Sequence, residues 1–383
     1  MNANPAATMS DADAEVLFRV VNRIAIVTLN RPQSLNALTL PMIRTLSDVL
    51  EHVRDDDAIA ALIIEGAGEK GFCAGGDVRT LYEQARHGDK LGEMGWQRFF
   101  AEEYRLDYEL HTFEKPVVAL LDGITMGGGM GLGQAANLRI TTTRTKMAMP
   151  ETRIGLLPDV GATHFLAAMP PQMALYLGLT GATLGGIDAV RVGLADACVP
   201  VDALIDLDEQ LLRVRFDGDV LASLRAMLTG SADLQSNSTS ALAPFSSLIM
   251  RHFEPGANVA DVITSLRNAL DSDPSSNERD WLRRTLDSLV GCSPTMQLVT
   301  REALIRGRQM SLAQCFRMEL GIIARAVEEG DFCEGVRAHL VDKDKNPHWV
   351  PSNVETVPIE RVSHFLSSPW QSDAHPLADL GGE

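Results

Sequence analysis

The chain has 383 residues, of which 45% are hydrophobic and 22% charged, and its formal net charge is -17. This length and composition predict a globular protein of two domains, or of one domain with a large extension. The negative charge disfavours nucleic acids and anionic membranes as partners, although local donors could still hold a phosphate-bearing ligand. A membrane-embedded protein is also disfavoured, because no apolar run reaches the ~20 residues of a bilayer span.

The first elements of the chain alternate between strand and helix patterns. Residues 16–21 and 24–29 are apolar or alternating runs separated by two residues, which predicts a β-hairpin. Apolar spacing of three and four predicts a helix over 41–53, and a continuous apolar run predicts a buried strand over 59–64. A glycine-rich loop is expected over 66–76.

The same alternation continues to about residue 200. We expect helices over 77–87 and 96–111, a strand over 117–121, a helix from 127 to about 136 and a strand over 138–142. Strands that alternate with helices are typical of an α/β fold.

The pattern changes in the second half of the chain. Helix-period segments dominate residues 201–345, and the tail over 346–383 is rich in proline and polar residues. We therefore predict a catalytic core over 14–200, a helical C-terminal region over 201–345 that packs on it, and an irregular tail.

The cysteine pattern and the N-terminal sequence indicate the cellular compartment of the protein. The five cysteines are scattered and form no C-x-x-C pair, which favours free thiols in a reducing compartment. The first residues are acidic and lack the features of a secretory signal or a transit peptide. We expect a cytoplasmic protein, and the sequence leaves a homo-oligomer open.

Two glycine-rich segments could bind an anion through backbone N–H groups. The first is Phe72-Cys73-Ala74-Gly75-Gly76-Asp77, where Asp77 is placed to cap the helix that follows. The second is the triple glycine at 127–129, which would weaken a helix start by roughly 1 kcal/mol per residue against alanine. A tight turn without ligand and close helix packing are the structural alternatives for the two segments.

The triple glycine is followed by a pattern that resembles a dinucleotide fingerprint. Residues 131–136 fit G-x-G-x-x-A, but these glycines fall inside the expected helix and not on the turn that a pyrophosphate needs. No metal site is expected either, because the nine histidines include no H-x-x-H or H-E-x-x-H pattern.

A third segment carries two carboxylates in apolar surroundings. Glu151 and Asp159 lie in the run from Met149 to Gly161. Apolar surroundings raise carboxyl pKa values and suit acid–base chemistry. The structural alternative is that Glu151 caps a turn and Asp159 caps a helix that begins near Gly161.

The three segments, in this order, resemble the crotonase (enoyl-CoA hydratase/isomerase) superfamily. Leu-Asn-Arg-Pro at 29–32, Leu-Asn-Ala-Leu at 35–38, Ala-Gly-Gly-Asp at 74–77 and the triple glycine carry the resemblance, which covers roughly residues 14–200. It implies a core of ββα repeats that binds acyl-CoA.

The resemblance also implies roles for backbone groups. The N–H groups of Gly76 and Gly128 would form an oxyanion hole for a thioester carbonyl. Ala37, Ala74 and Gly75 match the groove that grips the CoA adenine largely through the backbone. CoA is then part of the substrate, and no separate cofactor is expected.

The carboxylates point to one branch of this superfamily. Hydratases use two glutamates, of which one matches Glu151 and the other falls where this chain has Gly131. The run over 150–161 with Asp159 instead resembles the branch that hydrolyses 3-hydroxyisobutyryl-CoA. Glu103, at a substrate-contacting position, and the segment over 334–349 fit the same branch.

This branch implies hydrolysis of a short 3-hydroxyacyl-CoA, a step of valine breakdown. Glu151 would serve as the base toward water or as the nucleophile, and Asp159 would bond the 3-hydroxyl or shuttle a proton. Two alternatives stay open: a hydratase or isomerase on the same scaffold, and an acyl-CoA-binding protein without catalysis.

Overall fold

The structure is a computed structural model that describes residues 13–88, 95–230 and 240–381. The start of the chain, on which the predicted location rests, lies largely outside these ranges. The chain forms two compact units, each assembled from separate stretches. The first unit comprises residues up to Gly76, Leu106–Met147 and Leu184–Ala241, and the second comprises Asp77–Arg105, Ala148–Thr183 and Leu242–Glu383. The three successive segments expected from the sequence differ from these units, and their role as domains stays a prediction.

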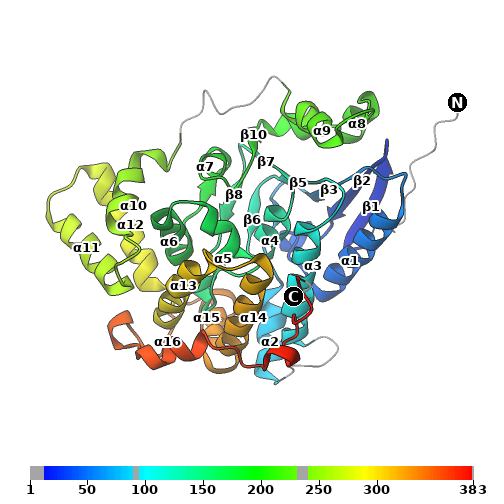
Figure 1. Cartoon of the computed structure of the whole chain (residues 1–383). Coiled ribbons are helices and arrows are strands. Elements are labelled where there is room, and N and C mark those ends of the chain that lie inside the picture. The colour runs from blue at the N-terminus through cyan, green and yellow to red at the C-terminus, as the bar shows by residue number, and fades with distance from the viewer. Residues whose placement is uncertain (1–12, 89–94, 231–239, 382–383) are drawn as a thin grey trace, which may run out of the picture. The chain divides into compact units, whose positions relative to one another are not determined.

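The first unit is built on a six-stranded sheet with the order β1-β2-β3-β5-β7-β10 (Figure 1). The strands are β1 (Val16–Val21), β2 (Ile24–Leu29), β3 (Ala61–Gly66), β5 (Val117–Leu121), β7 (Leu138–Thr142) and β10 (Ala197–Val199). Strands β1 and β2 are antiparallel, and each later neighbour pairs in parallel. Asn22 and Arg23 join the hairpin with φ of 48° and 70°, as a two-residue turn of this hand requires.

A smaller sheet has the order β4-β6-β8-β9. Its strands are β4 (Gly71–Cys73), β6 (Ile124–Met126), β8 (Lys146–Ala148) and β9 (Leu184–Gly185). Strand β4 lies inside the stretch predicted as loop, so that prediction was wrong over residues 71–73. Its backbone approaches β6 closely, since a Cβ on Gly71 would lie 3.0 Å from Ile124. Glycine at position 71 therefore permits the close pairing of two strands, a role different from forming a turn.

Helices complete the first unit. They are α1 (Leu40–Asp55), α4 (Gly128–Gln134), α7 (Gly186–Arg191), α8 (Leu207–Arg213) and α9 (Val220–Thr229). Alternate residues of the six-stranded sheet, such as Ile26 and Ile63, form one buried cluster with Leu211 of α8 and Leu224 of α9. This burial is the main stabilising contribution to the unit.

The second unit is helical. Its longer helices are α2 (Val78–Arg86), α6 (Pro171–Thr180), α11 (Val259–Asp271), α12 (Ser276–Gly291), α13 (Pro294–Gly307) and α14 (Leu312–Glu329). Shorter ones are α5 (Ala162–Phe165), α10 (Ser246–His252), α15 (Phe332–Val336) and α16 (Ile359–Phe365), and α3 (Trp96–His111) contributes residues 96–105. No strand follows β10 in the described residues, so the helical C-terminal region is confirmed, and α16 interrupts the tail expected to be irregular.

Candidate active site

The two glycine-rich turns meet in the first unit. Strands β4 and β6 run in parallel, so their carboxyl ends share one edge of the small sheet. Gly75 has φ of 100°, and a Cβ there would lie 3.4 Å from the Gly128 nitrogen. A Cβ on Gly129 would lie 2.2 Å from the Cys73 carbonyl oxygen. Only glycine permits this approach of the two backbones.

Two N–H groups at this meeting point are available to a ligand. Gly128 is the first residue of α4, so its N–H has no partner within the helix. In the described part of the chain, neither Gly76 nor Gly128 donates to a backbone acceptor. Gly76 is half-buried and Gly128 is buried, which strengthens a hydrogen bond to a developing negative charge. The oxyanion-hole role itself stays a proposal.

The expectation for Asp77 was only half right. Asp77 occupies the position before α2, as predicted, but its side chain makes no capping hydrogen bond to that helix. Its placement therefore contributes nothing to α2 through capping.

The predicted adenine groove is joined to the same turns. The Ala74 N–H donates to the Leu35 carbonyl at 3.0 Å, and the Leu38 N–H donates to the Gly75 carbonyl at 2.8 Å. These bonds bring Ala37 beside Ala74 and Gly75 within the first unit. The contact of these residues with CoA stays a prediction.

Asn36 shapes this groove and was not among the predicted site residues. It is fully buried with φ of 57°, and its side chain accepts from the Arg31 N–H at 2.9 Å. Its amide donates to the carbonyls of Ala67 and Gly71 at 3.0 and 2.9 Å. An asparagine inside the Leu-Asn-Ala-Leu stretch was the available signal, since asparagine tolerates left-handed backbone.

Three carboxyl groups gather in the second unit. Glu103 of α3, Glu151 and Asp159 have exposed fractions of 2%, 6% and 5%. Oxygen Oε1 of Glu103 and Oε2 of Glu151 have no hydrogen-bond partner within the described residues. Buried polar atoms are normally paired, so two unpaired acidic oxygens in one cluster indicate a site for a ligand or a reaction.

Burial and the charge of Asp159 change the acidity of the two glutamates. Burial, and next the neighbouring Asp159, raise the pKa values of Glu103 and Glu151 well above their ordinary range. Burial also raises the pKa of Asp159, to about 6, against the opposing effect of a hydrogen bond from Tyr104. A group that titrates near neutrality can both accept and return a proton.

Tyr104 is a site residue that the sequence did not single out. Its hydroxyl donates to Asp159 Oδ2 at 2.5 Å, and its side chain is fully buried. Burial raises the pKa of Tyr104 well above its ordinary value, so the phenol stays protonated and remains a donor. Its place directly after Glu103 was the only sequence signal.

The contacts of Asp159 correct the helix-cap alternative. The residue before α5 is Gly161, with φ of 85°, and no side chain caps that helix. The carboxylate of Asp159 is instead directed to Tyr104. Capping therefore does not explain an aspartate at this position.

The segment that carries Glu151 is held rigidly by the C-terminal helices. A Cβ on Gly155 would lie 2.4 Å from the Asp331 carbonyl carbon, just before α15. A Cβ on Gly335 would lie 2.4 Å from the backbone of Ile154, and the Ser293 N–H donates to the Thr152 carbonyl at 2.9 Å. This backbone packing fixes Glu151 more firmly than an exposed loop could.

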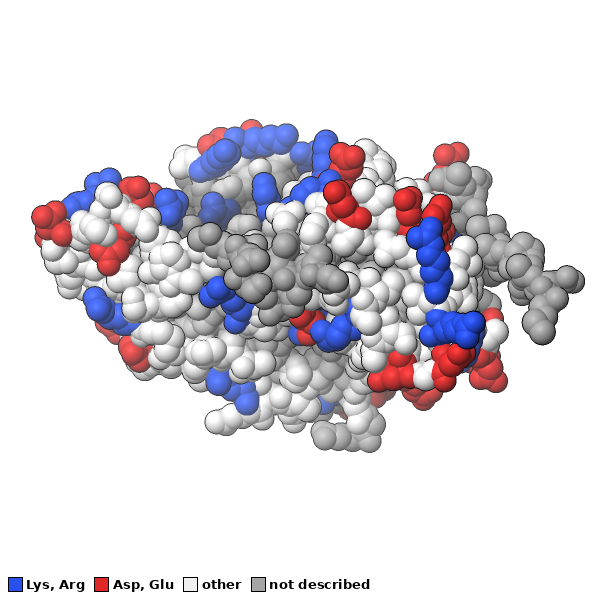
Figure 2. All heavy atoms as spheres, turned by 90° about the horizontal axis from the view of Figure 1, so that it is seen from above, with Lys and Arg blue, Asp and Glu red and all other residues white. Residues whose placement is uncertain are grey.

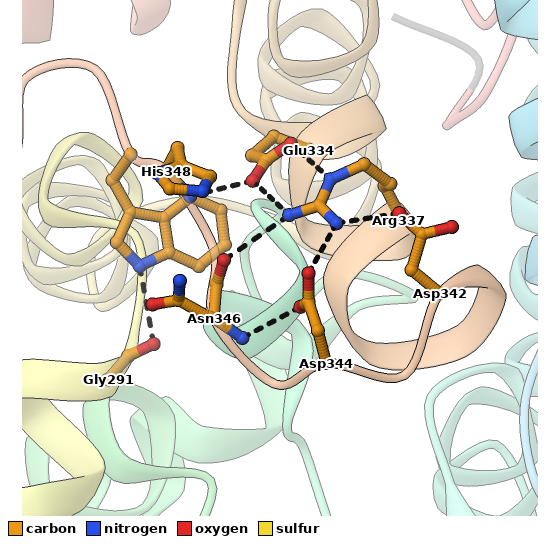
Figure 3. A network of polar contacts seen from close by, with 8 residues as sticks. Gly291, Glu334, Arg337, Asp342, Asp344, Asn346 and His348 are labelled. Atoms are coloured by element: carbon orange, nitrogen blue, oxygen red, sulfur yellow. Dashed lines mark hydrogen bonds and ion pairs between the residues drawn. The ribbon is translucent and has the colours of Figure 1, made fainter.

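The C-terminal segment that fits the hydrolase branch contains a network of charged side chains around Arg337 (Figure 3). The Arg337 guanidinium bonds Glu334, Asp342 and Asp344, each at 2.7 Å, and the His348 N–H donates to Glu334 at 2.6 Å. Arg337 begins one turn of π-helix that ends at Val341. The bonds to Arg337 lower the pKa values of Glu334 and Asp344, so both stay ionised. One cation thus joins a carboxylate of α15 to two carboxylates of the loop that follows.

We expect Arg337→Gln to loosen this loop, because the three carboxylates would then repel one another without a counter-charge. Lys343 and Lys345 have φ of 59° and 56°, a strained backbone that the network maintains. Trypsin should cut after Lys343 and Lys345 several-fold faster in the variant, as followed by mass spectrometry. The control is Arg213→Gln, which breaks an exposed pair with Glu209 on α8 and should leave this cleavage unchanged.

The surface carries charges of both signs. On the face drawn in Figure 2, basic and acidic side chains of the described residues are interspersed among uncharged ones. On that face, the acidic side chains of the described residues do not form one continuous patch. Among the helices of the described residues, none combines the length and the apolar character that crossing a membrane requires. No disulfide joins any of the five cysteines, all of which are described.

The fold and the two glycine turns define an enzyme scaffold for acyl-CoA chemistry. The chain belongs to the enoyl-CoA hydratase/isomerase family, whose model matches residues 24–366. Among curated proteins it is similar to the mitochondrial 3-hydroxyisobutyryl-CoA hydrolase of Danio rerio, with 38% identity over 94% of this chain and 91% of that protein. The hydrolase of the same name from Homo sapiens is 35% identical over 95% of this chain and 91% of its own length.

Solved structures of other family members have the same fold. A structure titled as a carnitinyl-CoA dehydratase from Mycobacterium thermoresistibile has a TM-score of 0.83 and 34% identity, covering 97% of this chain and all of that one. A structure titled as an enoyl-CoA hydratase from Rhodobacter sphaeroides has a TM-score of 0.80 and 33% identity, covering 93% and 98%. The superfamily expected from the sequence is confirmed. The curated relatives are described as mitochondrial, and the cytoplasmic location stays a prediction.

Proposed function

We propose that this chain hydrolyses the thioester of 3-hydroxyisobutyryl-CoA or of a related short 3-hydroxyacyl-CoA. The observation that carries the proposal is the buried cluster of Glu103, Glu151 and Asp159, in which two acidic oxygens lack partners among the described residues. The names of the similar curated proteins support the same reaction. A place in valine breakdown follows from this substrate and is part of the proposal.

In the proposed reaction, two backbone N–H groups stabilise charge on the thioester oxygen and one carboxylate acts as base or nucleophile. The N–H groups of Gly76 and Gly128 bond the thioester oxygen and stabilise its negative charge as the carbonyl carbon is attacked. Glu151 removes a proton from the attacking water, or attacks the carbonyl itself to form a mixed anhydride that water then opens. In both routes the C–S bond breaks, the CoA sulfur takes up a proton, and water supplies the new oxygen of the acid. The route needs no cofactor.

Asp159 and Glu103 are proposed to recognise the substrate. Tyr104 holds one Asp159 oxygen at 2.5 Å, which orients the carboxyl group for a bond to the 3-hydroxyl or for proton transfer. Asp159 raises the pKa of Glu103, and the Oε1 atom of Glu103 is unpartnered in the described chain. A buried site built for a hydroxyl disfavours analogues without one, because its polar groups then stay unsatisfied.

The second candidate is a hydratase or isomerase on the same scaffold. It is favoured by the names of the two similar solved structures and by the presence of more than one carboxyl group beside Glu151. It is disfavoured by Gly131, which lies buried in α4 where hydratases of the resembled family carry a glutamate. Hydration moves a proton onto carbon and leaves the thioester intact, so the two reactions give different products.

The test measures thiol release from 3-hydroxyisobutyryl-CoA and isobutyryl-CoA, and both thiol release and loss of the double bond from crotonyl-CoA. We expect thiol release to be fastest with the 3-hydroxylated thioester. Rapid hydration of crotonyl-CoA without thiol release would establish the hydratase instead. Thiol release at the rate of the blank for every thioester would leave acyl-CoA binding without catalysis.

The pH dependence of kcat/KM should show the effect of Asp159 on the acidity of Glu151. Because Glu151 must lose its proton before it can act, kcat/KM should rise with pH along a limb whose midpoint lies well above the ordinary glutamate pKa of about 4.3. Burial and the charge of Asp159 raise that pKa. Asp159→Asn removes the charge, so the midpoint should move to lower pH in a pH–rate profile. An unmoved midpoint would contradict the coupling of Glu151 to Asp159.

A further inference from the structure

We propose that Glu319, on helix α14, is a positioning residue that holds Asp159 in its working orientation. Glu319 lies in the helical C-terminal region, far along the chain from the predicted site, and its side chain is fully buried. The inference rests on the proposed function, in which Asp159 recognises the 3-hydroxyl.

The carboxyl group of Glu319 binds the backbone directly after Asp159. Its Oε2 atom accepts from the Gly161 N–H at 2.7 Å, and its Oε1 atom accepts from the Thr163 N–H at 2.9 Å. The Thr163 hydroxyl lies 2.6 Å from the same Oε1 atom. The Glu319 side chain therefore bonds the backbone at two positions of the turn over residues 159–163.

This turn needs an external restraint. Val160 has φ of 53° and Gly161 has φ of 85°, and a β-branched residue in the left-handed region is strained. Such a conformation persists only where its surroundings determine it. The bonds to Glu319 supply that restraint at the residues that follow Asp159.

The same face of α14 also supports the other partner of Asp159. Phe316 lies one helical turn before Glu319, and its ring packs against that of Tyr104 with centroids 5.6 Å apart. A Cβ on Gly161 would lie 3.1 Å from the Phe316 ring. Helix α14 thus contacts both Tyr104 and the turn after Asp159, which are the two elements that orient the Asp159 carboxyl.

Glutamine cannot reproduce the role of Glu319. Both glutamate oxygens accept from backbone N–H groups, whereas glutamine offers one oxygen and places an NH₂ group opposite the other donor. Burial raises the pKa of Glu319 to about 8, partly offset by the bonds from Thr163 and Gly161. The groups that contact both oxygens are all donors, so these bonds stabilise the ionised carboxylate.

The test compares kcat/KM for 3-hydroxyisobutyryl-CoA with kcat/KM for isobutyryl-CoA. This ratio does not change when part of the enzyme is merely unfolded, since both rates fall together. In Glu319→Gln we expect the ratio to drop roughly tenfold, the scale of one displaced hydrogen bond to the substrate. The control is Asp188→Asn, in the first unit, where a buried carboxyl that accepts from Ser240 and Ala241 keeps only one of its two acceptor oxygens, and the ratio should hold.

Two further measurements decide the remaining cases. If Glu319→Gln fails to fold, Thr163→Val removes the hydroxyl contact with Glu319, keeps both backbone bonds to it, and should lower the ratio by a smaller factor. Hydrogen exchange of the Gly161 and Thr163 amides, measured without substrate, should quicken in each folded variant. If the parent prefers 3-hydroxyisobutyryl-CoA and a folded variant keeps the same ratio of kcat/KM values, the inference is wrong. A parent that shows no preference for the 3-hydroxyl would instead overturn the proposed function.

Discussion

Glu151→Gln is expected to lower kcat for thiol release by at least about 10²-fold, the size of effect that follows loss of a general base. Glutamine keeps the volume of the buried side chain but cannot accept a proton or attack a carbonyl. The loss should appear in kcat with little change in CoA affinity, because the predicted adenine groove lies on other residues. Steady-state thiol release and a CoA-binding titration measure the two quantities.

Stability is the main confounding effect for this variant. The unpartnered Oε2 atom and the raised pKa of Glu151 mean that burial of this acid is costly, so glutamine should unfold at the same or a higher temperature. Glu65→Gln, which alters a half-buried acid paired with Arg19, serves as the isosteric control and should keep its turnover. Near-normal turnover in Glu151→Gln would remove Glu151 from the reaction.

Gly128→Pro should lower kcat by about 10²–10³-fold, as expected when one oxyanion donor is removed. Proline lacks the N–H but is well tolerated at the first position of a helix, which is the position that Gly128 occupies in α4. Turnover is compared between parent and variant preparations whose thermal unfolding profiles agree.

The matched variant for this experiment is Gly128→Ala, which adds a Cβ and keeps the N–H. If the N–H is the active feature, alanine should retain much more activity than proline. Equal losses in both variants would attribute the effect to the added atoms, and the oxyanion role of Gly128 would then be refuted.

Local patterns predicted most of the elements correctly. The hairpin around Asn22 and Arg23 and the strands at 117–121 and 138–142 appear at the expected residues, because apolar runs and short turns act over neighbouring positions. Strand β4 was missed because a three-residue strand between glycines has no period to detect. The two glycine turns were recognised as ligand-binding candidates, and the structure confirms that they meet.

The carboxyl cluster was only partly visible in the sequence. Glu151 and Asp159 share one segment, and Glu103 was found through resemblance alone. Tyr104 and Glu319 were not found, because their roles depend on contacts with partners 55 and more than 150 positions away. No local periodicity records such contacts, and a buried acid on α14 looks in sequence like any polar residue of a helix.

The buried acids also have a consequence for the folding equilibrium. Each of these carboxyl groups binds its proton more tightly in the folded chain than in the unfolded chain, where ordinary values near 4 apply. Unfolding in neutral solution therefore releases protons, and the contribution of these groups to the free energy of unfolding decreases as the pH rises from about 4 toward the pKa of about 8 at Glu319. These buried acids thus make the fold more stable in mildly acidic than in alkaline solution, whereas ionised Glu151 needs the higher pH for turnover.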